Sequence, residues 1–87
     1  MAEYKIFFKA SVEKDFRIIP RKDILRILHR IKSLTADPRP AGCEKLTGQE
    51  RYRLRYGNYR IVYSIHDDIL TVWVVKIAHR KDVYRQD

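Results

Sequence analysis

The sequence predicts an α+β domain in which two N-terminal helices pack on one face of a small twisted antiparallel sheet. Three observations support this fold class. Two amphipathic segments lie before residue 35, three β-like runs follow residue 50, and a short aromatic-rich run precedes them all. A chain of 87 residues has room for a single domain, which we expect to span residues 1–87.

The first half of the chain predicts one strand and two helices. Residues 4–9 (Tyr-Lys-Ile-Phe-Phe-Lys) form a strand-like run that should join the later sheet. Ser11 is expected to cap a helix that continues to about residue 18, and Pro20 ends this helix and opens the next. Over 21–34, apolar residues recur at spacings of three and four, which predicts an amphipathic helix that stops before a Pro-Arg-Pro run.

The second half predicts a meander of three strands. Residues 41–50 are interpreted as a loop, and the strict alternation over 51–56 has the period of a strand. A Gly-Asn turn separates this run from a strand at 59–65, and a His-Asp-Asp turn leads into a last strand at 69–77. The chain should end in a short tail with one helical turn near 82–85.

The composition excludes several classes of protein. With 45% hydrophobic and 34% charged residues, the chain is not a disordered one, and a single cysteine excludes a disulfide framework and a cysteine-built metal site. No apolar run approaches the ~18–20 residues of a membrane span, and the N-terminus does not resemble a signal peptide. We therefore expect a soluble, cytoplasmic protein.

The charge indicates a polyanionic partner. Nineteen Lys and Arg against eleven Asp and Glu give a net charge of +8, which favours nucleic acid, a ribosome or an acidic protein over a role in solubility alone. Strand alternation puts Arg51, Arg53 and Arg55 on one face, and the hairpin should bring Arg60 close to Arg55. Guanidinium groups bind phosphate through paired hydrogen bonds, so this cluster suits RNA better than an ordinary polar face.

Other chemistry in the sequence is sparse. There is no Gly-rich phosphate loop, and no two histidines have the spacing of zinc ligands. Cys43, expected in a loop, is interpreted as incidental. His79 and Arg80 follow the last predicted strand and Tyr84 lies four residues further on, where functional groups are common. A surface histidine and a tyrosine that pins the tail are the alternatives.

Four motifs together resemble the RelE branch of the RelE/ParE toxin superfamily. They are Lys-Leu-Thr-Gly at 45–48, Tyr-Arg-Leu-Arg at 52–55, Gly-Asn-Tyr-Arg-Ile-Val-Tyr at 57–63 and His-Arg-Lys-Asp-Val-Tyr at 79–84. Their order and spacing match over nearly the whole chain. The resemblance implies a toxin of a bacterial or archaeal type II toxin–antitoxin pair. Such a toxin inhibits translation by cleaving mRNA in the ribosomal A site, without a metal ion or cofactor.

The resemblance also implies a role for each matching residue. Arg60 would hold the scissile phosphate, Arg80 would stabilise the phosphorane charge, and Tyr84 would orient or deprotonate the attacking 2′-hydroxyl. Arg53 and Arg55 match a pair that is lysine in the best-known members.

That departure changes the expected acid chemistry. Because arginine stays charged, Arg53 and Arg55 are poor proton donors, and His79 becomes the candidate general acid. The RNA-binding set is expected to be Lys45, Arg51, Arg53, Arg55, Arg60 and Lys81.

Two alternative functions remain open from the sequence. One is a ParE-like protein that inhibits DNA gyrase by binding; the other is an inactive toxin that acts only in a repressor complex with its antitoxin. ParE members generally lack the arginine–tyrosine set, so Arg80 and Tyr84 favour the RelE branch. In each case the basic surface implies a cognate acidic antitoxin as partner, beside mRNA and rRNA on the ribosome for the RelE branch. No membrane or small-molecule cofactor is expected.

Overall fold

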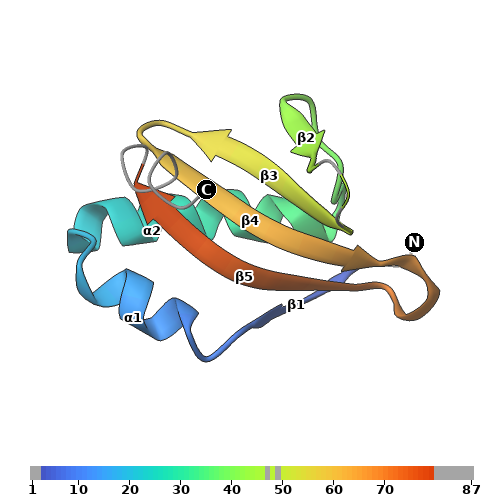
Figure 1. Ribbon diagram of the computed structural model, residues 1–87, viewed down its shortest axis with the longest axis horizontal. Coiled ribbons are helices and arrows are strands. Elements are labelled where there is room, and N and C mark those ends of the chain that lie inside the picture. Colours follow the sequence, from blue (N-terminus) through green and yellow to red (C-terminus); the bar gives the residue numbers. More distant parts are fainter. Residues whose placement is uncertain (1–2, 47, 49, 80–87) are drawn as a thin grey trace.

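Five strands form one sheet in the spatial order β1-β5-β4-β3-β2 (Figure 1). The computed structural model describes residues 3–46, 48 and 50–79. β1 runs parallel to β5, and every other neighbouring pair is antiparallel. This confirms the predicted α+β class and the pairing of the first strand with the later sheet. The strands are β1 (Lys5–Phe8), β2 (Cys43–Lys45), β3 (Arg51–Tyr56), β4 (Tyr59–His66) and β5 (Thr71–His79).

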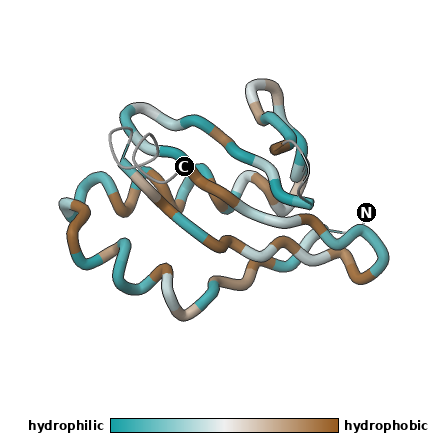
Figure 2. Tube along the Cα trace, viewed as in Figure 1, coloured by the Kyte–Doolittle hydropathy of each residue, from teal (hydrophilic) through white to brown (hydrophobic). Residues whose placement is uncertain are grey.

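The two helices precede the meander in sequence, as predicted. α1 (Val12–Arg17) packs beside β5, and α2 (Arg21–Lys32) runs behind the sheet in Figure 1 and ends in a 3₁₀ turn at Ser33–Thr35. Hydrophobic and hydrophilic residues alternate along α2 (Figure 2), because only one side of the helix faces the sheet. The fully buried core joins both layers through Val12, Ile27, Ile31, Leu34, Leu54, Ile61, Tyr63, Val72, Val74 and Ile77.

The hairpin between β3 and β4 has the predicted turn. Gly57 has a φ of +58°, a left-handed conformation that glycine adopts without steric cost. The two-residue connection fixes the register, so that Tyr56 pairs with Tyr59 and Arg55 pairs with Arg60. Residues that pair across the hairpin lie on the same side of the sheet, so Arg55 and Arg60 share one side and Tyr56 and Tyr59 share the other.

Three sequence-based expectations need correction. The segment interpreted as a loop contains β2, a three-residue edge strand whose pairing with β3 outweighs its weak β propensity. Ser11 has helical dihedrals and makes no capping hydrogen bond, so it does not cap α1. β5 begins two residues later than expected, because a 3₁₀ turn at Asp67–Ile69 and a left-handed Leu70 (φ 47°) precede it. The expected helical turn near 82–85 lies outside the described residues.

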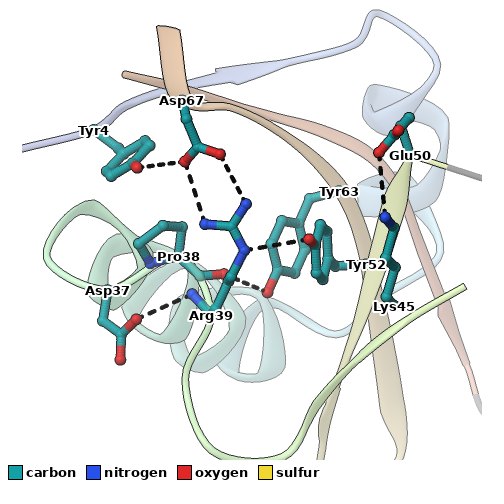
Figure 3. A network of polar contacts seen from close by, with 9 residues as sticks. All are labelled: Tyr4, Asp37, Pro38, Arg39, Lys45, Glu50, Tyr52, Tyr63 and Asp67. Carbon is teal, nitrogen blue, oxygen red and sulfur yellow. Dashed lines mark hydrogen bonds and ion pairs between the residues drawn. The ribbon is translucent and has the colours of Figure 1, made fainter. Parts of the chain in front are cut away.

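A polar network joins the loop after α2 to the end of the sheet far from the Gly57 hairpin (Figure 3). The Arg39 guanidinium donates to both oxygens of Asp67, at 3.2 and 2.9 Å, and to the Tyr52 hydroxyl at 3.2 Å. Tyr4 donates to the same carboxylate at 2.6 Å. The buried Tyr63 holds the same loop by donating to the Pro38 carbonyl oxygen at 2.8 Å. The network thus ties β3, β4 and Tyr4, the residue before β1, to one loop.

We expect Asp67→Asn to lower the melting temperature at neutral pH. Hydrogen bonds from Arg39 and then Tyr4 lower the pKa of Asp67 from 3.8 to about 2. The carboxylate therefore stabilises the fold fully above pH 3.8, and this contribution is lost as the pH falls through about 2. Thermal unfolding between pH 7 and pH 2 should show the wild-type and Asp67→Asn curves converging in acid. Asp68→Asn, a change to the exposed neighbouring acid, is the matched control; an equal loss at pH 7 would contradict the prediction.

Candidate nucleic-acid interface

The arginines lie on the sheet face that points away from the helices. Tyr52 and Tyr56 pack against the hydrophobic core, and Leu54 between them is fully buried in it. The intervening residues of β3 therefore point to the other side, which we call the open face. Each of these residues pairs with a residue of β4 on the same face: Arg51 with Ser64, Arg53 with Val62 and Arg55 with Arg60. The open face thus carries Arg51, Arg53, Arg55 and Arg60, as the alternation predicts.

Arg60 occupies the centre of this arrangement. It pairs with Arg55 on one side and with Ala78 on the other, so it lies between two strands rather than at an edge. It is only 8% exposed and is the one charged residue of the buried class in the described part of the chain. Burial restricts the rotamers of a long side chain, so Arg60 presents its charge with less mobility than a surface arginine.

An acid from β2 also lies on the open face. Glu44 pairs in register with Arg53, and the two side chains form an ion pair with Nη2 2.9 Å from Oε1. Arg53, and more weakly the charge of Arg60, lower the pKa of Glu44. The cluster therefore contains a carboxylate beside its arginines, although residues 51–65 of the sequence include no acid. The acid was missed because its segment was interpreted as a loop.

The other candidate RNA-binding residue in this region lies at the edge of the sheet. Lys45 pairs in register with Tyr52, not with an arginine. Its Nζ lies 3.6 Å from a carboxylate oxygen of Glu50, and both side chains are largely exposed. The structure thus does not bring Lys45 into the arginine cluster.

His79 lies on the helix side of the sheet. It ends β5 and pairs with Tyr59, whose ring it meets edge-on at 5.5 Å between centroids. The Tyr59 hydroxyl donates to Asp23 of α2 at 2.8 Å, and burial and this bond raise the pKa of Tyr59. Because neighbouring residues of a strand alternate, His79 and Arg60 point to opposite faces. The structure therefore does not place His79 among the arginines.

The remaining candidates follow His79 in the chain. Arg80, Lys81 and Tyr84 lie outside the described residues, so their expected roles stay predictions. Within residues 3–46, 48 and 50–79, no group of three metal-ligating side chains comes together. None of the helices in this part of the chain is long and apolar enough to cross a membrane.

Comparisons with known proteins identify the family. The family model for the ParE toxin of the type II toxin–antitoxin system parDE matches residues 6–84. Toxin RelG of Mycobacterium tuberculosis is 26% identical, with 95% of this chain and 98% of that protein covered.

Solved structures of RelE toxins have the same fold. The archaeal RelE–RelB complex of Pyrococcus horikoshii superposes with a TM-score of 0.78 at 26% identity, over 88% of this chain and 94% of that one. The intact E. coli RelBE complex gives a TM-score of 0.72 at 25% identity, over 87% and 95%. The chain belongs to the RelE/ParE superfamily and is a toxin of the type II toxin–antitoxin class.

Proposed function

We propose that this toxin is a ribosome-dependent endoribonuclease that cleaves mRNA in the A site and so inhibits translation. The observation that supports it best is the open face, where Arg55 lies directly opposite the buried Arg60 and Arg53 lies one pleat away. Three guanidinium groups on one rigid surface suit a phosphate that gains negative charge during reaction.

The reaction we propose is an internal transfer. The 2′-oxygen attacks the adjacent phosphorus, the P–O5′ bond breaks, and a 2′,3′-cyclic phosphate remains on the upstream fragment. Arg60 holds the phosphate, Arg80 stabilises its extra charge, and Tyr84 takes the proton of the 2′-hydroxyl. The 5′-oxygen leaves with a proton from water or from a donor on the ribosome, since His79 faces the other side of the sheet. Alignment and charge stabilisation supply most of the rate.

The test is cleavage of a defined message on programmed ribosomes. The purified toxin should yield fragments with 2′,3′-cyclic phosphate ends at the A-site codon, and naked message should be cut far more slowly. Intact message on ribosomes, together with normal amino-acid incorporation in cells that express the toxin, would contradict the proposal.

A ParE-like activity is the second candidate, because the matching family model is that of ParE. A gyrase inhibitor would leave messages intact and block DNA supercoiling in a reaction with purified gyrase. Measuring both activities with one preparation separates the two candidates. A toxin that does neither would act only within a repressor complex.

The proposed partner is a cognate acidic antitoxin. The net charge of +8 favours an acidic segment, and related RelE toxins have been solved with RelB bound. An antitoxin that covers the open face would block access of RNA to Arg60.

Glu44→Gln should strengthen RNA binding and make it more salt-dependent. The substitution removes the carboxylate that pairs with Arg53 and frees that guanidinium for a phosphate. The slope of log affinity against log salt for single-stranded RNA should steepen by about 0.7, the value for one more phosphate contact. Fluorescence anisotropy with a labelled RNA measures this slope. Glu13→Gln, which removes an exposed acid from α1, should leave it unchanged; an equal change in both would make the effect one of net charge only.

A further inference from the structure

We propose that Phe7 and Trp73 form a stacking platform for an RNA base next to the arginine cluster. The ligand is a nucleotide of the single-stranded message that flanks the scissile phosphate, so the inference rests on the proposed function and deepens it. No catalytic role is assigned to the platform.

The sheet register places the platform in a row across the open face. Arg51 pairs with Ser64, Ser64 pairs with Trp73, and Trp73 pairs with Phe7, so one row crosses β3, β4, β5 and β1. Ser64 lies four residues along β4 from Arg60, a separation of about 13 Å at the usual rise of a strand. A single strand of RNA held at Arg60 therefore has this row within its path along the sheet.

The two rings are stacked and exposed. Their centroids are 5.1 Å apart and their planes differ by 28°. Phe7 is 45% exposed and Trp73 is 36% exposed, whereas the large aromatic residue on the helix side of β4, Tyr63, is fully buried. The rings are thus not part of the core, and they offer a flat apolar surface in water. Such surfaces on sheets bind unstacked bases.

A shallow groove beside Trp73 has the polar groups that a nucleotide needs. Its volume is about 400 Å³, and its lining includes Lys9, Arg51, Ser64 and His66. The two cations suit the flanking phosphates, and the Ser64 hydroxyl, which already shares a hydrogen bond of 3.1 Å with Nε2 of His66, keeps capacity for a further one. Stacked rings, cations and a hydroxyl together match the three parts of a nucleotide.

An acidic segment of the antitoxin is the competing occupant. Carboxylates would pair with Lys9 and Arg51, but they would gain nothing from the stacked rings. Glu50 also lines the groove and repels carboxylates and phosphates alike, so the stacked rings are the feature that separates the two occupants. The observations therefore favour a nucleotide.

The chain contains a single tryptophan, so its fluorescence reports this site alone. We expect 2′-O-methyl hexaadenylate, which has no 2′-hydroxyl to react, to quench Trp73 in a saturable titration. The base-free polyanions hexaphosphate and hexaglutamate should quench far less. Equal quenching by hexaphosphate would reduce the site to general anion binding, and stronger quenching by hexaglutamate would identify a peptide site; either result overturns the proposal.

Neighbouring residues of β1 provide a matched pair of variants. Phe7→Leu should weaken the hexaadenylate affinity by roughly 5-fold or more, as expected when a stacking contact is lost. Phe8→Leu removes the same ring from the opposite face, where Phe8 contacts Phe16 at 6.1 Å between centroids, and should change the affinity less than 2-fold, well within one ordinary contact. Equal effects of the two variants would contradict the platform, and thermal unfolding shows whether either variant is misfolded.

A ribosome experiment separates this inference from the proposed function. Trp73→Leu should slow cleavage, and Trp73→Phe should restore most of the rate. An abasic nucleotide at one message position near the cut should abolish the difference between wild type and Trp73→Leu. If no message position does so, the base comes from rRNA and the proposal is wrong. If hexaadenylate binds the platform but wild-type toxin does not cleave at all, the platform stands and the proposed function fails.

Discussion

Arg60→Ala should lower the single-turnover rate of message cleavage on programmed ribosomes by at least ~100-fold, the usual cost of removing one group that stabilises transition-state charge. Arg60 is expected to have the largest effect of the open-face arginines, because its position is fixed by burial between β3 and β5. Arg60→Lys keeps the charge but loses the planar fork, so it should recover only part of the rate.

The design must separate chemistry from folding, because Arg60 is only 8% exposed. Thermal unfolding of each variant by circular dichroism gives the fraction folded at the assay temperature. Arg17→Ala, which removes an exposed arginine from α1, controls for net charge and should cleave at the wild-type rate. A folded Arg60→Ala protein that cleaves like wild type would exclude Arg60 from the mechanism.

The arginine face was predictable because two local signals agree. Alternation over the β3 segment assigns Arg53 and Arg55 to one side, and the Gly-Asn pair fixes a two-residue turn. Once the turn is known, the register follows, and the position of Arg60 opposite Arg55 needs no long-range information. The helices were predictable for the same reason, since their apolar spacing is local.

The position of Glu44 was not predictable in this way. β2 has three residues with weak β propensity, and it is a strand only because the edge of β3 offers it hydrogen bonds. Tertiary pairing of this kind has no local pattern. The same holds for the stacked pair of Phe7 and Trp73, which are 66 positions apart and meet only because β1 adds to β5 in parallel.

His79 lies on the face opposite the arginines for a geometric reason. The sequence indicates that it lies near the end of the last strand, but the face depends on where β5 pairs with β4. Val62 pairs with Lys76 but Tyr63 pairs with Val74, so β5 has one extra residue at this point. This bulge reverses the alternation of β5, and the sequence of β5 alone therefore does not give the face on which His79 lies. With Tyr59 opposite it, His79 points toward α2.

Comparison of Arg80→Ala with His79→Ala is the second decisive experiment. Under the proposed function Arg80 stabilises the charge of the phosphorane, so its loss should slow single-turnover cleavage by at least ~100-fold. His79 contacts the Tyr59 ring on the helix side, so His79→Ala should slow cleavage less than ~10-fold, the scale of a positional rather than a chemical effect.

The pH dependence distinguishes a residual role of His79 from a structural one. If His79 donated the proton to the leaving oxygen, the wild-type rate of cleavage would decrease as the pH rises, and His79→Ala would remove that decrease. We expect instead that both proteins show the same profile, because the ring faces Tyr59 and not the arginines. Single-turnover rates from pH 5.5 to pH 9 on one ribosome complex measure this. A larger loss for His79→Ala than for Arg80→Ala, with a changed profile, would mean that the histidine reaches the substrate and that charge stabilisation by arginine is not the main source of the rate.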